Sequence, residues 1–160
     1  MTRLWTGLVA LLLAGAAMAA PPPETTDDTG AIKAVLAAYK TALERRDLTG
    51  VEKLFAERNE VIESGKVEGS YADYVTHHIG PELGHIQQFT FDDYAVTVEQ
   101  AGDIAWATET YRYTIVLPDR AEPIVRQGVA TTVLERQEGA WKIRAMHSSS
   151  RAPKTPAATP

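Results

Sequence analysis

The feature that most constrains the fold of this chain is a change in the spacing of its apolar residues near residue 86. Before that point, apolar residues such as Leu36, Tyr39 and Leu43 recur every three or four positions, which predicts amphipathic helices. After it, apolar and polar residues alternate through several segments up to about residue 150, which predicts antiparallel strands. Helices followed by a run of strands are typical of the α+β class.

Local signals mark the ends of several expected elements. Ser70 followed by Asp73 has the form of a capping box and predicts the start of a short helix. Gly80-Pro81 is expected to end that helix, since proline clashes with the preceding turn. The alternation of apolar residues reverses its phase near Asp92-Asp93, which predicts a β-bulge there.

The two ends of the chain differ in composition from its middle. Residues 1–20 combine a positive start, an apolar run and small residues at a cleavage site, which indicates a signal peptide and a periplasmic or secreted protein with no membrane attachment after cleavage. Residues 21–26 form a Pro-rich leader, and residues 152–160 are expected to be a disordered tail. One domain is therefore expected over residues 27–151, and the absence of cysteine excludes disulfides.

The net charge excludes one class of partner. The formal charge is −5, with both signs scattered along the chain. Nucleic-acid binding needs a concentrated basic surface, and no basic stripe is present. The sequence therefore predicts no nucleic-acid partner.

Two segments carry a family resemblance. Residues 35–63, "VLAAYKTALERRDLTGVEKLFAERNEVIE", and residues 139–143, "GAWKI", are similar to the opening and the last strand of the nuclear-transport-factor-like, or SnoaL-like, superfamily, which includes ketosteroid isomerases and polyketide cyclases. The resemblance implies a curved antiparallel sheet wrapped around N-terminal helices, forming a cone with one pocket. It is specific for fold and poorly specific for activity.

The resemblance also implies a catalytic pair. In the isomerase members, a Tyr at the position of Tyr39 donates a hydrogen bond to an oxyanion and a carboxylate at the position of Glu63 moves the proton. Alternation along the last strand places His147 on the apolar face with Trp141, so His147 is the third catalytic candidate. The isomerases also use a protonated Asp on a late strand, where this chain has Thr131 or its neighbour. A steroid isomerase is therefore disfavoured.

Further residues are candidates for ligand or metal binding. The expected inward stripe of the helix that starts near Ser70 carries Tyr71, Tyr74 and His78, and Trp141 faces the same interior. These four residues are the predicted ligand-binding set. No cofactor or metal is expected, although a divalent metal could be held if the fold assembled His78, His147 and Glu82.

Three functional hypotheses follow, in this order. The first is an exported protein whose mainly apolar pocket, with a few polar groups, binds a small molecule. The second is a proton-transfer enzyme, isomerase-like or cyclase-like, that uses Glu63, Tyr39 and His147. The third is a histidine-based metal-binding protein. The resemblance also leaves open a homodimer formed through the outer face of the sheet.

Overall fold

The computed structural model describes residues 27–154, so the predicted signal peptide, the leader and residues 155–160 of the tail lie outside the described residues. Its long helix is α1 (Thr29–Arg45), which a 3₁₀ helix, η1 (Val51–Leu54), follows. A second helical segment consists of α2 (Tyr71–Tyr74), η2 (Val75–Ile79) and α3 (Gly80–His85). No helix within the described residues is long and apolar enough to cross a membrane.

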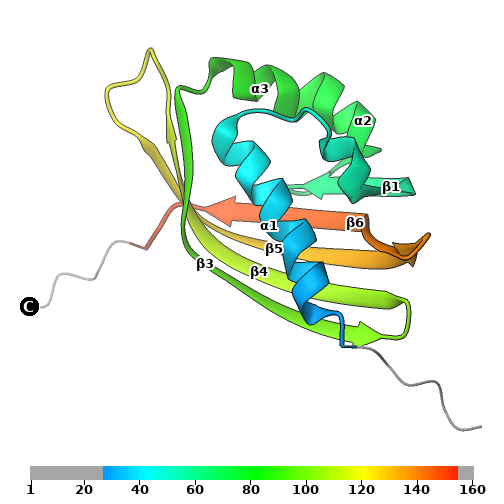
Figure 1. Ribbon diagram of the computed structural model, residues 1–160. Helices are drawn as coiled ribbons and strands as arrows, with labels where there is room; N and C mark the ends of the chain where they lie inside the picture. The colour runs from blue at the N-terminus through cyan, green and yellow to red at the C-terminus, as the bar shows by residue number, and fades with distance from the viewer. Residues whose placement is uncertain (1–26, 155–160) are drawn as a thin grey trace, which may run out of the picture.

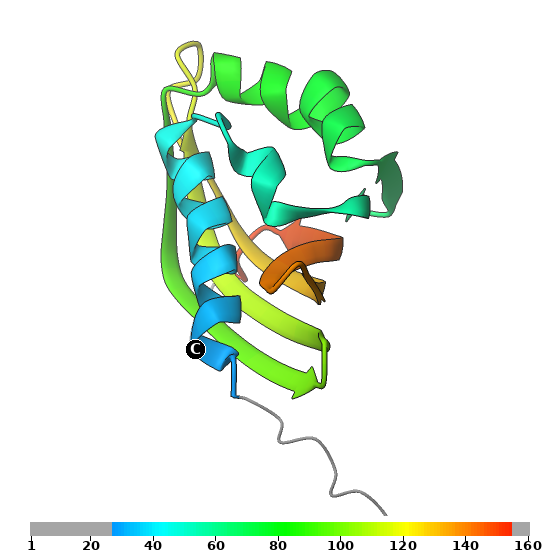
Figure 2. The ribbon, with the colours of Figure 1, turned by 45° about the vertical axis from the view of Figure 1, so that its right-hand side comes forward.

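The strands form a single six-stranded sheet of the described chain in the order β2-β1-β6-β5-β4-β3. The strand bounds are β1 (Phe55–Glu63), β2 (Lys66–Gly69), β3 (Gln88–Ala101), β4 (Ile104–Val116), β5 (Ile124–Gln137) and β6 (Ala140–Arg151). All neighbouring strands are antiparallel except β1 and β6, which are parallel. The sheet curves around α1, with α2 and α3 across one end (Figure 1 and Figure 2). The predicted α+β class is confirmed.

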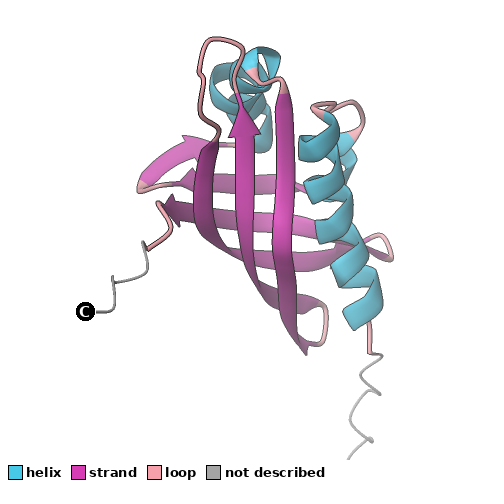
Figure 3. Ribbon diagram, turned by 90° about the vertical axis from the view of Figure 1, so that its left-hand side faces the viewer, coloured by secondary structure: helices cyan, strands magenta, loops and turns pink. Residues whose placement is uncertain are grey.

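Bulges give the sheet its bend. The register between β3 and β4 shifts between Asp92 and Ala95, where Asp93 has a left-handed backbone with φ of 53°. This is the predicted bulge, and it increases the local twist of the strands. The helices lie on the concave side, and none of the helices described in residues 27–154 covers the opposite face of the strands (Figure 3). The inner, concave face of the sheet is therefore the one that α1 covers.

The core fills the closed part of this cone. Ile32 and Leu36 of α1 pack against inner-face residues such as Leu134 and Ile143, and all four side chains are fully or almost fully buried. The alternation of β4 puts Ala105 and Ala107 inward, and these small side chains let α1 approach the sheet closely. The larger aromatic side chains collect farther along the sheet, toward the open end.

The second helical segment begins as predicted and continues where it was expected to stop. The Ser70 hydroxyl accepts from the Asp73 N–H at 3.2 Å and the Asp73 carboxylate accepts from the Ser70 N–H at 3.0 Å, so the capping box is confirmed. The prediction that Gly80-Pro81 ends the helix is wrong. The chain makes a π-helical turn, in which the Gly80 N–H bonds to the Val75 carbonyl, and α3 then starts with Pro81 near its N-terminus. The wider turn removes the clash that proline would make in a regular α-helix.

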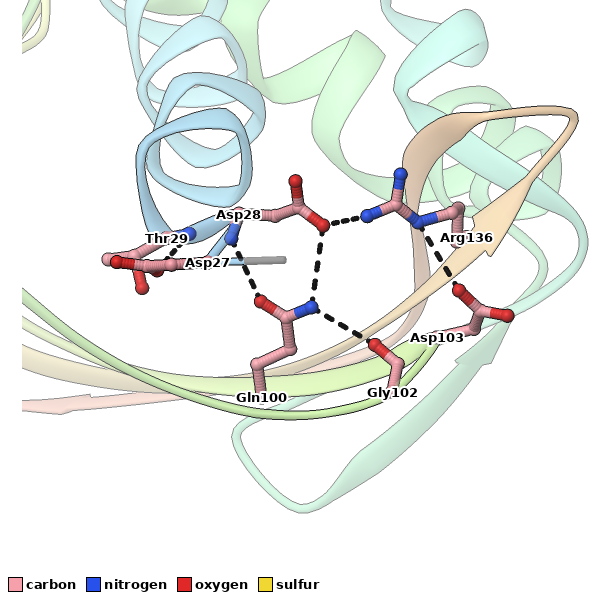
Figure 4. A network of polar contacts seen from close by, with 7 residues as sticks. All are labelled: Asp27, Asp28, Thr29, Gln100, Gly102, Asp103 and Arg136. Carbon is pink, nitrogen blue, oxygen red and sulfur yellow. Dashed lines mark hydrogen bonds and ion pairs between the residues drawn. The ribbon is translucent and has the colours of Figure 1, made fainter. Parts of the chain in front are cut away.

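A polar network ties the start of α1 to the narrow end of the sheet (Figure 4). The backbone N–H of Asp28 donates to Gln100 Oε1 at 3.0 Å, and the Asp28 carboxylate pairs with Arg136. Arg136 also contacts Asp103 at 3.3 Å. Asp28 is the N-cap residue of α1, but its side chain pairs with Arg136 of β5 and does not accept from the helix's own N–H groups.

Candidate functional site

A cavity of about 120 Å³ opens between α1, the second helical segment and the inner face of the sheet. Its wall combines eight aliphatic, methionine or phenylalanine residues with five tyrosines, three glutamates, one lysine and one serine. The lining residues are Tyr39, Lys40, Leu43, Glu63, Tyr74, Ile79, Glu82, Ile86, Phe89, Phe91, Tyr94, Glu109, Tyr111, Tyr113, Ile115, Ala130, Met146 and Ser148. The cavity is therefore rich in phenols and carboxylates on an apolar background.

Glu63 and Tyr74 form the first polar pair of this wall. Glu63 is the last residue of β1, where its register partner in β6 is Ser148, and Tyr74 ends the helix that the capping box starts. The Tyr74 hydroxyl donates to Glu63 Oε2 at 2.5 Å. Burial, with the nearby Tyr39 and Glu63, raises the pKa of Tyr74 far above its ordinary value. Tyr74 therefore stays protonated and holds the carboxylate in place.

Tyr39 lies on the buried face of α1 and lines the same cavity as Glu63. Its ring packs edge-on against Phe55, with the ring centroids 5.7 Å apart. Burial is the main cause that raises the pKa of Tyr39, so its hydroxyl is a neutral donor. No hydrogen-bond partner for this hydroxyl is found within residues 27–154. A ligand in the cavity could therefore accept a hydrogen bond from the Tyr39 hydroxyl.

Glu109 is a buried acid of the wall that was not predicted from the sequence. It is 7% exposed, its Oε2 accepts from the Tyr94 hydroxyl at 2.5 Å, and its Oε1 accepts from Thr132 at 3.1 Å. Burial raises the pKa of Glu109 and outweighs these two bonds, which lower it. A signal was present in the sequence: Glu109 follows Ala105 and Ala107 in the inward phase of β4.

Thr131 and Thr132 are the candidates for the late-strand position at which the family resemblance implies a second acid. The side chain of Thr132 is fully buried and contacts Glu109, whereas Thr131 is exposed on the outer face. The neighbouring strand thus places an acid in this part of the interior, although β5 itself has none there. An acid on β4 was not considered from the sequence.

Lys40 is the single basic residue of the cavity wall. Its ammonium pairs with Glu44 at 2.7 Å, one helical turn further along α1. It also lies 5.7 Å from the ring centroid of Phe91 and 5.5 Å from that of Tyr94. These distances are within the range of a cation–π contact, so the wall already accommodates one ammonium group.

The predicted inward orientation of His147 is wrong. A β-bulge between β5 and β6 pairs Leu134 with Ile143 but Val133 with Ala145, which leaves one extra residue in β6. The bulge reverses the phase of the strand, so that Met146 and Ser148 line the cavity. His147 is exposed on the outer face, away from Tyr39 and Glu63.

Two members of the predicted ligand-binding set belong to the core and do not line the cavity. The ring of Tyr71 stacks on Phe55 with centroids 4.0 Å apart, and the Tyr71 N–H donates to Asn59 Oδ1, which holds it against β1. Trp141 is buried at the start of β6, with the Arg136 guanidinium 5.1 Å from its ring. Tyr74 is the member of that set that reaches the cavity.

His78 lies beside the cavity without lining it. The π-helical turn adds a residue, and this moves the inward position from His78 to Ile79, which is buried and lines the wall. His78 Nδ1 lies 3.0 Å from Glu68 and Nε2 lies 3.2 Å from Glu82, so the imidazole contacts both acids. His147 is not part of this cluster, and no group of three or more potential ligands that could hold a metal ion occurs in the described part of the chain.

Comparison with solved structures supports the cone architecture. A candidate dehydratase of the NTF2-like family from Streptomyces avermitilis superimposes with a TM-score of 0.68 at 19% identity, covering 79% of this chain and 97% of its own. Hexachlorocyclohexane dehydrochlorinase LinA-type3 from Novosphingobium barchaimii LL02 gives 0.67 at 15% identity, with coverages of 82% and 92%. A candidate ketosteroid isomerase from Shewanella frigidimarina gives 0.63 at 26% identity, with coverages of 74% and 94%.

The sequence itself matches the SnoaL-like domain over residues 32–153. The chain therefore belongs to the SnoaL-like family, and its fold is that of the NTF2-like and ketosteroid isomerase-like structures on which it superimposes. No curated protein matches the sequence. The resemblance seen in residues 35–63 and 139–143 is confirmed at the level of the family.

Proposed function

We propose that the cone binds a compact small molecule about the size of a single six-membered ring. The observation that carries this proposal is the cavity of about 120 Å³, with the unpartnered Tyr39 hydroxyl and Glu63 in its wall. Cavities for drug-sized ligands usually measure about 300–1,000 Å³, whereas a cavity of about 150 Å³ holds benzene. The apolar part of the wall would enclose the ring and the polar groups would orient it.

The size of the cavity argues against a whole steroid inside the cone. The Glu82 side chain lines the cavity but is 58% exposed, so it marks the opening. Any part of a ligand beyond one ring would have to pass this opening into solvent. A rigid set of four fused rings does not fit that arrangement.

A screen of single-ring compounds by thermal shift and calorimetry tests the proposal. Ala130 lines the cavity from β5, so Ala130→Leu should fill part of it and weaken binding at least tenfold. Ala95→Leu, which adds the same atoms on the exposed side of β3, is the matched control and should bind like the wild type. Binding that survives Ala130→Leu unchanged, or the absence of any bound compound, would refute a cavity site.

A second candidate function is proton-transfer catalysis, and the arrangement of Glu63, Tyr39 and Glu109 favours it. Glu63 would take a proton from carbon, and the Tyr39 hydroxyl would stabilise the negative charge that develops. The protonated form of Glu109, which burial favours, adds a second acid to the same wall. The names of the structural neighbours, a dehydratase, a dehydrochlorinase and an isomerase, denote reactions in which a proton leaves carbon.

Exchange of carbon-bound protons in D₂O tests this second function. Cyclohexanone and cyclohexane-1,3-dione are single-ring probes with acidic C–H groups, and NMR follows their deuteration. General-base catalysis contributes about 10²–10⁴-fold, so Glu63→Gln should lower the enzyme-dependent rate by at least a hundredfold. Glu99→Gln, at an exposed position of β3, is the control with the same charge change. Equal rates for both variants would exclude Glu63 as the base.

We also propose that the protein is exported to the periplasm or beyond. Residues 1–20 supply the charged start, apolar run and small-residue cleavage site of a signal peptide. Mass spectrometry of the protein recovered after osmotic shock should find a mature chain that begins at Ala20 or Pro21. An intact Met1 in the cytoplasmic fraction would contradict export.

A homodimer through the outer sheet face is proposed on the side chains exposed there. Trp106 of β4 is 41% exposed and Val129 of β5 is 45% exposed, on the face that no helix of the described residues covers. Sedimentation should detect a dimer that Trp106→Glu dissociates. A monomer at high protein concentration would contradict this proposal without affecting the cavity.

A further inference from the structure

The cavity wall carries more carboxylates than cations, and this excess bears on the charge of the ligand. Among the described residues, the wall contains Glu63, Glu82 and Glu109 against the single cation Lys40. Lys40 is already paired with Glu44 at 2.7 Å, so its charge is compensated outside the wall. The question is therefore which of the three acids still lacks a partner for its carboxylate.

Two of the three acids, Glu82 and Glu109, already have partners among the neighbouring side chains. Glu82 lies 3.2 Å from His78 Nε2 at the solvent-exposed opening. Both oxygens of Glu109 are occupied, one by Tyr94 and one by Thr132, and burial raises the pKa of this group toward its neutral form. Glu109 therefore has no oxygen left for a ligand, and Glu82 already contacts a histidine at the opening.

Glu63 is different. Its Oε2 accepts from Tyr74, and no basic side chain of the described chain forms an ion pair with it. Lys66, the nearest basic residue in sequence, pairs instead with Glu68 at 2.7 Å. A carboxylate without a cationic partner attracts a positively charged ligand, and an anionic ligand would be repelled at the same place.

The aromatic part of the wall favours a positive guest as well. Ring faces attract an ammonium group, and Phe91 and Tyr94 already hold that of Lys40 at 5.7 Å and 5.5 Å. Phe89, Tyr111 and Tyr113 also line the cavity and add to its aromatic surface. A ring-bearing amine could thus stack its ring on these side chains and direct its ammonium to Glu63.

From these contacts we propose that the cavity selects a single-ring organic cation of the primary-amine class and discriminates against carboxylate ligands. The Glu63 carboxylate accepts hydrogen bonds from the ammonium group, and the aromatic wall encloses the ring. The Tyr39 hydroxyl is available to any acceptor on the ring. This inference rests on the proposed small-molecule site and adds the charge of its ligand.

Three probes of nearly equal shape test the charge preference: benzylamine, benzyl alcohol and benzoate, compared by calorimetry at pH 7. A charge-assisted hydrogen bond is roughly twice as strong as a neutral one. The wild type should therefore bind benzylamine at least tenfold more tightly than benzyl alcohol and bind benzoate most weakly. Glu63→Gln should remove the preference for the amine, and Glu99→Gln should keep it. Circular dichroism of each variant verifies folding.

The outcomes separate this inference from the function on which it rests. Benzoate bound as tightly as benzylamine by the wild type would overturn the charge preference while leaving a small-molecule site in place. A preference for the amine that survives Glu63→Gln would overturn the assignment of Glu63. If none of the three probes binds, the single-ring site itself fails together with this inference. The wild-type comparison requires no variant, so it decides the matter even if Glu63→Gln unfolds.

Discussion

The Tyr94 hydroxyl reaches across from β3 to donate a 2.5 Å hydrogen bond to Glu109 Oε2 on β4. Tyr94 is the residue that follows the left-handed Asp93 in the β3 bulge, so the bulge sets the direction of this phenol. Glu109 is thereby held inside the sheet with a second bond from Thr132. An ionisable group in such a place makes the stability of the fold depend on pH.

Replacing this acid should change the pH dependence of unfolding. Burial raises the pKa of Glu109 above its ordinary value of 4.5, so the native state keeps the proton at pH values where the unfolded chain has lost it. Between 4.5 and the raised pKa, the free energy of unfolding should therefore fall as pH rises, and it should level off above that pKa. Urea titrations at several pH values should show this slope as a difference between the wild type and Glu109→Gln. A difference that grows in the opposite direction would contradict the shift, and Glu99→Gln should leave the slope unchanged.

Glycine at position 80 should be required by the π-helical turn. A Cβ at Gly80 would lie 2.3 Å from the Val75 carbonyl oxygen, the acceptor of the π-type hydrogen bond. Gly80→Ala should lower the free energy of unfolding by about 1–3 kcal/mol, the usual cost of overpacking. Gly84→Ala in the same helix meets nothing within 4 Å and should stabilise by roughly 0.5–1 kcal/mol, since alanine favours helix. Equal effects of the two substitutions in chemical denaturation would argue against the π turn.

Gly128 should be coupled to the ring of Tyr111, its register partner on β4. A Cβ at Gly128 would lie 2.1 Å from the Tyr111 ring, so the ring packs directly on the glycine backbone. Gly128→Ala should destabilise by about 1–3 kcal/mol in the wild type and by clearly less in a Tyr111→Ala background. The double-mutant cycle should give a coupling energy above about 0.5 kcal/mol. Strict additivity would show that the ring does not occupy this place.

The polar network at the start of α1 should stabilise the narrow end of the cone. Asp28→Asn keeps the shape of the side chain but removes the charge that pairs with Arg136. Because both side chains are partly exposed, the expected loss is only about 1 kcal/mol, and high salt should reduce it. Asp27→Asn, at the exposed neighbouring position, keeps an acceptor for the Thr29 N–H and should be near neutral. Thermal unfolding at low and high salt measures both effects.

The parts of the fold that the sequence predicts are those set by local spacing. The helical period of α1, the capping box of Ser70 and Asp73 and the bulge after Asp92 all lie within short windows, and all three are present. The family resemblance predicts the topology of the fold, and with it that Tyr39 and Glu63 line the same cavity. Local pattern and family membership together thus account for the cone and one side of its wall.

The features that the sequence did not predict have a different cause from those that it did. The π turn lets the helix pass Gly80-Pro81, although every local rule predicts a stop there. The alternation of residues along β4 places Glu109 inward, but an acid is not expected on a buried face. The bulge opposite Val133 and Leu134 depends on pairing between two strands, and no spacing within β6 reveals it.

The bulge between β5 and β6 determines which side chains of β6 line the cavity. If β6 paired with β5 without the bulge, Ala145, His147 and Ser149 would face inward. The imidazole of His147 would then line the cavity in place of the side chains of Met146 and Ser148. A single inserted or deleted residue after the bulge would make the same exchange without altering any other strand. Relatives that differ only in the length of this strand could therefore carry out different reactions with nearly identical sequences.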